Sequence, residues 1–524
     1  MEQMSSKNID FNEQFQKALE LMSETNNNIF ITGKAGTGKS TLLEYFRGVT
    51  KKKVVVLAPT GVAALNVGGQ TIHSFFRFKP DITVDSIPKY YGPMVKLCKA
   101  IDTVIIDEIS MVRADLLDCI DKCLRLNGKN SKKPFGGIQM VFFGDLYQLA
   151  PVVRSSEKAI FKDRYKTPYF FDASSFKDLD VEFVELEKIY RQKDQKFIDI
   201  LNAIRNNSVT EDDLEKINVR FNPNFKSGND DFYILLTPTN SKALRINEMN
   251  LEKIKKPLFT SRGVIKGKFD LKQLPTEMEL KLKIGSQVML VNNDIRGRWV
   301  NGSVGTILDI EKNRNGKNFI VVKLGDGKFV KVDKHNWEMF RFVYHQGTKS
   351  VESETIGSFT QYPIRLAWAV TIHKSQGKTF EKVIVDFDKG TFAHGQAYVA
   401  LSRCTTLDGL VLKRPIEKKH ILMDWRIVKF LTNFQYGLSN KLLSINDKVD
   451  LIKKAIKDKK RLEITYLKAN DQKSKRVIIP KEVGLMEYLG KEYLGVEAYC
   501  CLRQDDRVFR VDRVLDLKEA KDEE

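Results

Sequence analysis

The 524-residue sequence has only six cysteines, 14 prolines and no apolar run that approaches the length of a membrane helix. Cysteines this sparse do not form the disulfide framework of a secreted scaffold, and they fit a reducing compartment. A spanning helix needs roughly 18 or more consecutive apolar residues, so a transmembrane protein is excluded. Residues 1–10 are polar and lack the apolar segment of a secretory signal. We therefore expect a cytoplasmic protein with no membrane partner.

Acidic residues are also fewer than basic ones. Asp and Glu number 67 against 87 Lys and Arg, which gives a formal net charge of +20. This balance favours a polyanionic partner, with nucleic acid as the leading candidate, and the alternative is a solvated basic surface. Aromatic residues at 10%, with few glycines and prolines, exclude a disordered or collagen-like chain. At roughly 150 residues per domain, the length predicts about three or four domains.

Short apolar runs alternate with helical patterns through much of the chain. Apolar residues at helical spacing predict a helix over 11–24, with Asp10 as its N-cap. Strands that alternate with helices indicate a parallel α/β sheet, and two further strands predict a second α/β unit between about 181 and 430. The predicted strands are 29–32, 53–58, 103–106 and 139–143 in the first unit, and 233–237 and 383–386 in the second.

Two β-rich regions stand apart from these units. Short strands near 303–335, separated by the hairpin signals Asn315-Gly316 and Asp326-Gly327, predict a small all-β insertion. Residues 431–446 contain Gly437, Ser439 and Asn440, and their polar composition predicts a linker. Beyond the linker, 447–524 is predicted to form a separate domain, with a helix at 451–458 and strands at 462–466, 476–479, 493–502 and 508–511.

A glycine-rich segment, Gly33–Ser40, fits the pattern G-x-x-x-x-G-K-[ST] between a predicted strand and a predicted helix that ends at Gly48. Its glycines let backbone N–H groups surround phosphates, and the helix N-terminus adds its positive end. In such a loop Lys39 reaches the β- and γ-phosphates and Ser40 binds Mg²⁺. The sequence therefore predicts ATP and Mg²⁺ as cofactors.

Acidic and amide side chains follow two further buried strands. Asp107 and Glu108 come directly after the strand at 103–106, where a carboxylate is costly unless it holds a cation or a water. We expect Asp107 to hold Mg²⁺ and Glu108 to act as the general base for the attacking water. Gln148 follows the strand at 139–143, where a glutamine can hydrogen-bond a γ-phosphate, and a solvated side chain is the alternative.

Nine ordered segments together resemble the petite-integration-frequency (Pif) family of superfamily 1B DNA helicases, over roughly residues 10–425. The segments are Gly33–Ser40, Ala58–Ala64, Thr71–Phe75, Asp107–Ser110, Pro134–Gly137, Gly144–Gln148, Tyr190–Gln192, His373–Gly377 and Tyr398–Arg403.

This resemblance implies an α/β fold with two RecA-like P-loop NTPase lobes and ATP between them. The first lobe would span 1–180 with a wedge insertion at about 70–100, and the second 181–430 with an SH3-like β insertion at about 303–345. The resemblance also implies 5′→3′ movement on single-stranded DNA coupled to duplex unwinding. Forked or structured DNA is then the further partner, and we expect a monomer in solution.

Several site residues follow from the same resemblance. Gln16, or the nearby Gln14, is positioned as an adenine-reading glutamine. Arg191 and Arg403 look like arginine fingers of the second lobe, where a guanidinium stabilises charge on the transferring phosphoryl group. The predicted ATP-binding residues are Gln16, Gly33, Gly36, Thr37, Gly38, Lys39, Ser40 and Thr41.

Hydroxyl, amide and aromatic side chains follow the strands of both units and predict a DNA track. Short hydroxyls and backbone donors suit phosphate oxygens, and aromatic rings stack on bases without sequence preference. For an isolated histidine or phenylalanine, packing in the core is the alternative. The predicted DNA-binding residues are Pro59, Thr60, Gly61, Thr71, His73, Ser74, Phe75, Phe135, Gly136, Thr239, Asn240, His373 and Ser375, with Gln376 at the end of the last segment.

Residues 447–518 resemble a WYL domain in the segments Arg476–Pro480, Glu492–Leu494 and Arg507–Arg513. The sequence departs from that family at its name-giving tryptophan, which is Glu492 here. At strand spacing, Phe509 and Val511 point inward and Arg510 points outward. The cluster Arg503, Arg507, Arg510 and Arg513 predicts an anion-binding face for single-stranded nucleic acid, and a solvated basic face is the alternative.

Three functions remain open at this point. The leading one is an ATP-dependent 5′→3′ DNA helicase. The second is a DNA-dependent ATPase that remodels protein–DNA complexes without unwinding, and the third is a WYL-regulated nucleic-acid-binding switch; RNA stays open as the track's ligand. Cys119 and Cys123 lie one helical turn apart with no second pair at zinc spacing, so they are interpreted as buried thiols. The WYL resemblance indicates a bacterial protein associated with the nucleoid.

Overall fold

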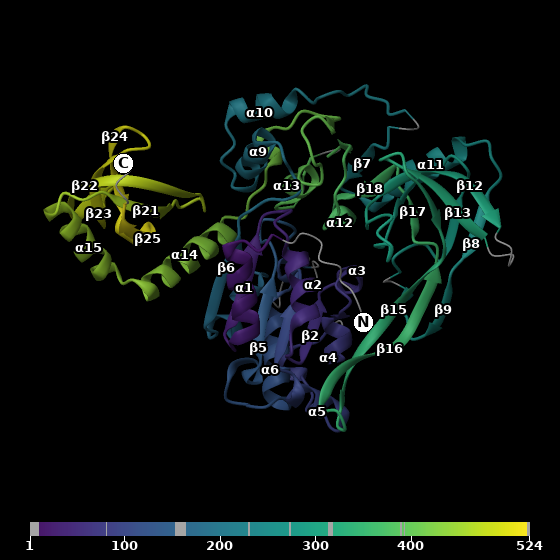
Figure 1. Ribbon diagram of the computed structural model, residues 1–524, viewed down its shortest axis with the longest axis horizontal. Coiled ribbons are helices and arrows are strands. Elements are labelled where there is room, and N and C mark those ends of the chain that lie inside the picture. The colour runs from purple at the N-terminus through teal and green to yellow at the C-terminus, as the bar shows by residue number, and fades with distance from the viewer. Residues whose placement is uncertain are drawn as a thin grey trace. The chain divides into compact units, whose positions relative to one another are not determined.

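The structure is a computed structural model that describes residues 10–520 apart from 80, 152, 154–163, 229–230, 272–273, 313–317, 388–389 and 392. The chain forms two compact units (Figure 1). The first comprises Met1–Ile204 and Val209–Leu422, and the second comprises Arg205–Ser208 and Met423–Glu524. The hairpin signal Asn315-Gly316 lies outside the described residues. No helix in the described part of the chain is long and apolar enough to cross a membrane.

The first lobe of the larger unit is built on a parallel sheet in the order β3-β2-β4-β5-β1-β6. Its inner strands are buried on both faces, which explains their continuous apolar sequences. This confirms the predicted parallel α/β sheet. The bounds are β1 Asn28–Gly33, β2 Val54–Ala58, β3 Gln70–Thr71, β4 Thr103–Ile106, β5 Gln139–Phe143 and β6 Val181–Leu186.

The predicted boundary between the lobes at residue 180 is wrong, because β6 pairs with β1 along its whole length. The segment 181–186 is therefore the last strand of the first sheet. The wedge region begins later than residue 70, because β3 pairs with β2 in the same sheet. The region then contains α4 Ile72–Phe76, the 3₁₀ helix η1 Val84–Ser86 and α5 Pro93–Ala100.

Helices cover both faces of this sheet (Figure 1). Helix α1 is capped by Asn12, whose side chain accepts from the Phe15 N–H, so the predicted cap at Asp10 is wrong. Helix α2 continues through Gly48 to Val49 instead of ending there. The remaining bounds are α1 Glu13–Glu24, α2 Lys39–Val49, α3 Gly61–Asn66, α6 Ala114–Asn127 and α8 Ser174–Lys177, with 3₁₀ helices η2 Ile109–Met111, η3 Pro134–Gly137 and η5 Phe170–Asp172.

The second lobe has a smaller parallel sheet in the order β18-β7-β19-β20. It confirms the second α/β unit that the two late apolar runs predicted. The strands are β7 Ile234–Thr237, β18 Ala369–Thr371, β19 Val383–Val385 and β20 Leu410–Leu412, and the helices are α9 Gln195–Arg205, α10 Glu211–Asn218, α11 Asn240–Lys253, α12 Ile372–Ser375 and α13 Gln396–Leu401, with the 3₁₀ helix η7 Lys418–His420.

The all-β insertion in this lobe is larger than predicted and extends from residue 259 to residue 366. It contains sheets in the orders β10-β8, β14-β13-β12-β11-β17 and β15-β16-β9. The hairpin β15–β16 packs on α5 of the first lobe, and the Phe342 N–H donates to Gln70 Oε1 over 3.1 Å. The strands are β8 Phe259–Arg262, β9 Val264–Gly267, β10 Glu279–Leu282, β11 Gln287–Leu290, β12 Val304–Lys312, β13 Asn318–Leu324, β14 Phe329–Val332, β15 His335–His345, β16 Ser350–Gln361 and β17 Ile364–Leu366.

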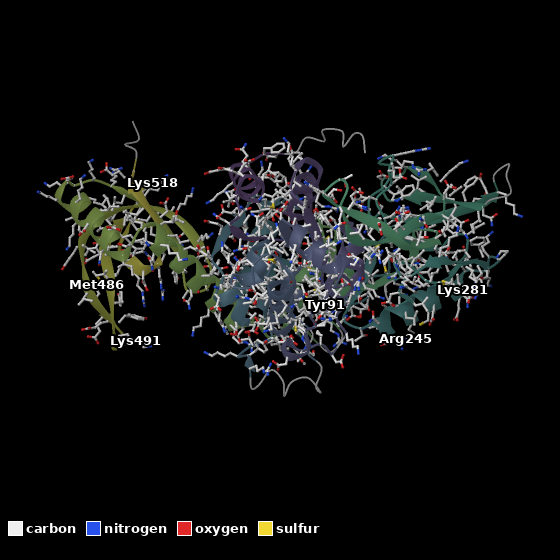
Figure 2. The ribbon with its side chains drawn as sticks, turned by 90° about the horizontal axis from the view of Figure 1, so that it is seen from below. Tyr91, Arg245, Lys281, Met486, Lys491 and Lys518 are labelled. Carbon is white, nitrogen blue, oxygen red and sulfur yellow. The ribbon has the colours of Figure 1, made fainter. Side chains whose placement is uncertain are left out.

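The second unit combines two helices with an antiparallel sheet in the order β24-β23-β22-β21-β25. The predicted linker at 431–446 is wrong, because α14 is continuous from Trp425 to Leu442 and buries Leu431 and Gln435. Figure 2 shows Met486 and Lys491 at the end of the projecting β22–β23 hairpin. The bounds are α14 Trp425–Leu442, α15 Ile445–Lys457, β21 Leu462–Leu467, β22 Lys473–Tyr488, β23 Lys491–Cys500, β24 Asp505–Arg510, η8 Val511–Arg513 and β25 Val514–Glu519.

Candidate active site and nucleic-acid interface

The glycine-rich loop lies between the carboxyl end of β1 and the N-terminus of α2. Gly36 and Gly38 have φ angles of 84° and 88°, which disfavour any residue with a Cβ. A Cβ on Gly36 would also lie 2.4 Å from the Arg191 Cβ atom. Lys39 Nζ donates to the carbonyls of Gly33 and Lys34 over 2.6 and 3.1 Å. The ammonium therefore lies against the loop in which it was predicted to bind phosphates.

Two carboxylates face this loop from the end of β4. Burial raises the pKa of Asp107, and Lys39 opposes that shift. Burial also raises the pKa of Glu108, with a further rise from Asp107, while Lys39 and Arg403 oppose it. Glu108 has a left-handed backbone, φ 52° and ψ 45°, which is strained for a residue with a side chain. The geometry brings Lys39, Asp107, Glu108 and Arg403 into a single electrostatic cluster, in which the Asp145 carboxylate also raises the pKa of Glu108.

Gln148 lies at the same edge of the first sheet, beyond β5. Its side chain is 7% exposed, and Nε2 donates to Asp145 Oδ2 over 3.2 Å. Gly395, at the N-terminus of α13, packs so closely that a Cβ there would lie 2.5 Å from the Gln148 carbonyl oxygen. The second lobe therefore contacts the peptide that carries the predicted γ-phosphate sensor.

The second lobe also contributes a buried guanidinium. Arg403 is 1% exposed, and its side chain donates to the Val399 carbonyl over 2.8 Å and to Ser402 Oγ over 2.8 Å. Burial lowers the pKa of Arg403 to about 9, with a further lowering from the neighbouring Arg191. The Ala35 N–H donates to the Tyr398 hydroxyl over 3.0 Å, which joins the phosphate loop to α13.

Arg191 belongs to the connection between the lobes more than to the second lobe, where it was predicted. The Tyr190 N–H donates to the Gly36 carbonyl over 2.8 Å, which holds this connection against the phosphate loop. Arg191 Nη1 donates to the Ser402 carbonyl over 3.3 Å, and burial lowers the pKa of its guanidinium. The Arg191 side chain thus reaches the loop that carries Arg403, and the two predicted arginine fingers lie close to each other.

The structure brings three further side chains to the site that were not predicted there. Gln376 Nε2 donates to Glu108 Oε2 over 3.1 Å, although the sequence assigned Gln376 to the DNA track. Tyr398 lies within one of the quoted segments but was given no role. The Tyr190 ring would lie 3.9 Å from a Cβ on Gly38, so it flanks the loop. All three lie within segments that carry the family resemblance, but their roles at this site depend on contacts between distant parts of the chain.

The adenine-reading role predicted for Gln16 finds no geometric support. Gln16 is exposed on α1, and its Nε2 donates to the Phe11 carbonyl over 2.9 Å. Gln14 is half-buried on the same helix. The aromatic ring beside the loop is that of Tyr190, whose hydroxyl bonds to Asn12 and Asp10 over 3.0 and 3.1 Å.

The residues present fit a nucleoside triphosphate with its magnesium ion. The loop supplies backbone N–H groups in a cradle that a Cβ at Gly36 would fill. Ser40 is exposed at the start of α2, and Asp107 is half-buried at the end of β4. Hydroxyl and carboxylate oxygens are ligands that Mg²⁺ accepts alongside phosphate oxygens. No group of three or more His, Cys, Asp or Glu residues able to hold a metal occurs within the described ranges.

The track residues predicted from the sequence gather at matching edges of the two sheets. In the first lobe Ala58 pairs with Thr71, so the segments that follow β2 and β3 leave the sheet side by side. In the second lobe Thr237 pairs with Thr371, so the segments that follow β7 and β18 do the same. Pro59, Thr60, Gly61, His73, Ser74, Thr239, Asn240 and His373 lie on these segments.

Three side chains of the predicted track are buried, and a fourth track residue, Gly136, is buried beside one of them. Phe75 is 4% exposed and packs against Phe76 and Phe342. Ser375 is fully buried and donates to the Ile372 carbonyl over 2.7 Å. Phe135 is fully buried, and Gly136 is buried beside it at the amino end of β5, the sheet edge opposite to the one that carries Thr71. This burial does not support DNA contact through the side chains of Phe75, Phe135 and Ser375, and Gly136 offers only its backbone.

The C-terminal arginine cluster does not form one face. Phe509 and Val511 are 4% and 0% exposed, as predicted, and Arg510 is half-buried. Arg507 and Arg510 are three residues apart on β24, so their side chains leave opposite faces of the strand. Arg510 also forms an ion pair of 2.7 Å with Asp512. Arg503 lies in the turn between β23 and β24, and Arg513 lies in η8.

All six cysteines are free, and Cys119 and Cys123 are buried on α6. Burial raises the pKa of the Cys119 thiol to about 12 and raises that of Cys123. Neutral thiols are poor metal ligands and poor nucleophiles. The interpretation of this pair as ordinary buried thiols is confirmed within the described structure.

Two parallel sheets with a phosphate loop on one and an arginine from the other define a two-lobed P-loop NTPase of the RecA-like class. Residues 8–215 match the model of the PIF1-like helicase family, and residues 447–519 match that of the WYL domain. The ATP-dependent DNA helicase Pif1 of Bdellovibrio bacteriovorus is 32% identical over 438 residues, which cover 82% of this chain and 93% of the relative. The chain belongs to the PIF1-like helicase family.

Solved structures of Pif1 from Bacteroides sp. are similar in fold. The complex with ADP-AlF4 has a TM-score of 0.76 at 38% identity, and it covers 82% of this chain and 98% of that one. The form bound to single-stranded DNA has a TM-score of 0.58 at 39% identity, with coverages of 81% and 96%. These likenesses confirm the predicted fold of two RecA-like lobes, with a separate C-terminal WYL domain.

Proposed function

We propose that this protein is an ATP-dependent DNA helicase that moves 5′→3′ along single-stranded DNA and unwinds forked or structured duplexes. The observation that carries the proposal is the composition of the nucleotide site. Lys39 and Glu108 come from the first lobe, Arg403 comes from the second, and matching track segments leave both sheets beside it. The solved relatives support the same activity, because their titles name complexes with single-stranded DNA and with forked duplex DNA.

The chain's own groups divide the work of hydrolysis. Backbone N–H groups of the loop and the Lys39 ammonium would hold the phosphates. Ser40 and Asp107 would hold Mg²⁺, which would supply charge neutralisation on the phosphate oxygens. Glu108 accepts the proton of the attacking water, because its carboxylate lies at the end of β4, next to Asp107 and near Lys39 and Arg403. Arg191 and Arg403 stabilise negative charge on the transferring group, and Gln148 contacts it.

Coupling follows from the placement of these groups on two lobes. The nucleotide is fully coordinated only when Arg403 and α13 lie against the phosphate loop, as the bond between Ala35 and Tyr398 has them here. Loss of the γ-phosphate removes contacts that span the cleft and favours opening. When each lobe holds DNA through its own pair of track segments, alternate closing and opening moves the protein along the strand.

The test is ATP-dependent unwinding of duplexes that carry a 5′ tail, a 3′ tail or no tail. We expect unwinding with the 5′ tail alone. We expect Glu108→Gln and Lys39→Ala to abolish it while single-stranded DNA affinity stays within about twofold, since neither residue lies on the track. Unwinding from the 3′ tail would overturn the polarity, and hydrolysis that survives Glu108→Gln would overturn the assignment of the base.

A translocating ATPase without strand separation is the second candidate. The single measurement that separates it is DNA-stimulated hydrolysis together with an absence of unwinding on all three substrates. Matched DNA and RNA strands of one sequence in the same hydrolysis assay test the nucleic acid. We propose DNA, on the support of the solved complexes.

We further propose that the WYL domain binds single-stranded nucleic acid and tunes the motor. Arg507 is exposed on β24, an edge strand of its sheet, where its guanidinium is accessible to phosphate. A clean truncation ends at Leu422, because a cut near residue 440 would divide α14 and expose Leu431. Unchanged affinity and unwinding in the variant truncated at Leu422 would overturn this role.

Location and assembly complete the proposal. We infer a cytoplasmic, nucleoid-associated protein, because its proposed substrate is DNA and all six cysteines are free thiols. We also infer a monomer in solution, which light scattering at micromolar concentration tests directly.

A further inference from the structure

We propose that Gln376 is a positioning residue that orients the general base Glu108 from the opposite lobe. The inference rests on the proposed function of Glu108. Its central observation is the hydrogen bond from Gln376 Nε2 to Glu108 Oε2, 3.1 Å long, between residues 268 positions apart. The donor belongs to the second lobe and the acceptor to the first.

Gln376 is held where it can do this by the turn that precedes it. Helix α12 starts at Thr371, whose hydroxyl accepts from the Lys374 N–H, and it ends with Gln376 as its C-cap. The Gln376 N–H donates to the His373 carbonyl over 3.3 Å. The backbone of Gln376 is therefore fixed to the β18 edge of the sheet, and His373, on the predicted DNA track, lies in the same turn.

The base itself needs such a partner. Glu108 lies in the short connection between β4 and η2 with a strained left-handed backbone, and its side chain has three rotatable bonds. A catalytic base works when a third group fixes its orientation toward the proton that it accepts. With Oε2 engaged by Gln376, the carboxylate keeps Oε1 for the attacking water. An amide donor serves this purpose without adding a charge to the site.

The same segment also touches the arginine finger. Two residues beyond Gln376, the Lys378 carbonyl accepts from Arg403 Nη1 over 3.2 Å. The Lys378 ammonium bonds to Asn301, which donates to Asn66 at the end of α3 over 3.2 Å. Residues 376–378 therefore contact both the base and the finger and are tied to the first lobe at a second point. Seating the second lobe orients both groups together.

The test compares Gln376→Met, which keeps the length of the side chain without the donor, with Gln376→Glu, which places a like charge beside Glu108. At saturating single-stranded DNA we expect kcat for ATP to fall roughly tenfold with Met and further with Glu, because small misplacements of reacting groups are costly. We expect the KM for ATP and the Kd for DNA to stay within about twofold of wild type. An unchanged kcat, or a loss confined to KM or Kd, would overturn the proposal.

A double-mutant cycle separates positioning from a merely structural role. Glu108→Asp keeps a carboxylate but shortens the side chain, so it no longer reaches Gln376. In that background Gln376→Met has nothing left to orient, and we expect it to lower kcat by less than about twofold. Additive losses would assign Gln376 a structural role and overturn the proposal.

Two further variants make the failures distinguishable. Gln195→Met is the matched control, because Gln195 is exposed on α9 and its side chain donates to Asp199 in the same helix over 2.8 Å. It should match wild type in every assay. Hydrolysis that survives Glu108→Gln would show that the proposed base is wrong. Loss of hydrolysis in Glu108→Gln with wild-type rates in both Gln376 variants would overturn this inference alone.

Discussion

The two lobes carry nearly the same turn at the same place, and they use it differently. In the first lobe, β3 leads through Thr71 into α4, and in the second, β18 leads through Thr371 into α12. Both turns read Thr-Ile-His, and both threonine hydroxyls accept a backbone N–H three residues on. Each lies beside a strand followed by Pro-Thr.

The two turns differ in the residues that follow the shared Thr-Ile-His. Helix α4 continues into Phe75 and Phe76, which are buried and pack against each other at 4.7 Å between ring centroids. Helix α12 stops at Ser375 and releases Gln376 toward Glu108. The turn at α4 therefore anchors its predicted track segment in the core through Phe75 and Phe76. The turn at α12 instead connects its predicted track segment to Glu108 through Gln376. The same local geometry serves as an anchor or as a link, depending on the side chains that follow it.

The largest expected effect, on the free energy of unfolding, comes from removing a buried ring of α4 in the first lobe. Phe76→Ala removes a fully buried ring and should lower the free energy of unfolding by about 3–5 kcal/mol. Urea denaturation followed by circular dichroism measures this loss. Gln376 occupies the corresponding position of the second lobe and is only half-buried, so Gln376→Met should leave the unfolding midpoint unchanged. Equal losses at both positions would contradict the division of roles.

The shared threonine caps should behave alike. Thr71→Ala and Thr371→Ala each remove a side-chain acceptor at a helix start, and each should cost about 1 kcal/mol of stability. The measurement is again urea unfolding of the full chain, with each single variant compared with wild type. A cost at one cap without a cost at the other would show that the two turns are not equivalent even in their common part.

Much of the fold was predictable because its signals are local. Apolar runs that follow a single polar residue gave β4 and β5 at their observed bounds, since inner parallel strands are buried on both faces. The phosphate loop was predictable because glycines are required where φ is positive, as at Gly36 and Gly38. The resemblance of the ordered segments gave the order of the two lobes.

Apart from the ends of α1 and α2, the errors depend on pairing between distant segments. Only the ladder between β6 and β1 assigns residues 181–186 to the first sheet. Ser439 looked like a linker residue, but it is 5% exposed and donates to the Leu515 carbonyl over 2.7 Å. Phe135 looked like a stacking residue until the fold buried its ring. The contact between Gln376 and Glu108 is likewise visible only once the lobes are in place.

A finer difference lies in the threonines that follow β2 and β7. Thr60 is already engaged as the cap of α3 through its hydroxyl, which accepts from the Ala63 N–H over 3.2 Å, whereas Thr239 is exposed and makes no such bond at the start of α11. Thr239→Val should therefore weaken single-stranded DNA binding by up to about fivefold, the worth of one hydrogen bond, without loss of stability. Titration of a fluorescent oligonucleotide at fixed salt measures it.

The matched Thr60→Val variant should mainly lose stability, by about 1 kcal/mol for the lost cap. Its DNA affinity should change less than that of Thr239→Val. The reverse order of affinities would indicate that the second-lobe hydroxyl faces away from the DNA.

The smallest effect concerns the two histidines of the shared turn. Burial lowers the pKa of His73, with a further lowering from Arg113, and burial also lowers the pKa of His373. A histidine with a depressed pKa binds fewer protons in the folded state than in the unfolded one, so stability rises with pH. Its contribution is fully present above the unfolded pKa near 6.5 and is lost as pH falls toward the folded pKa. The variant with both His73→Gln and His373→Gln should therefore lose less stability than wild type between pH 7.5 and pH 5.5. Thermal unfolding across that range measures the difference, and parallel curves for the two proteins would show that neither imidazole is held neutral by the fold.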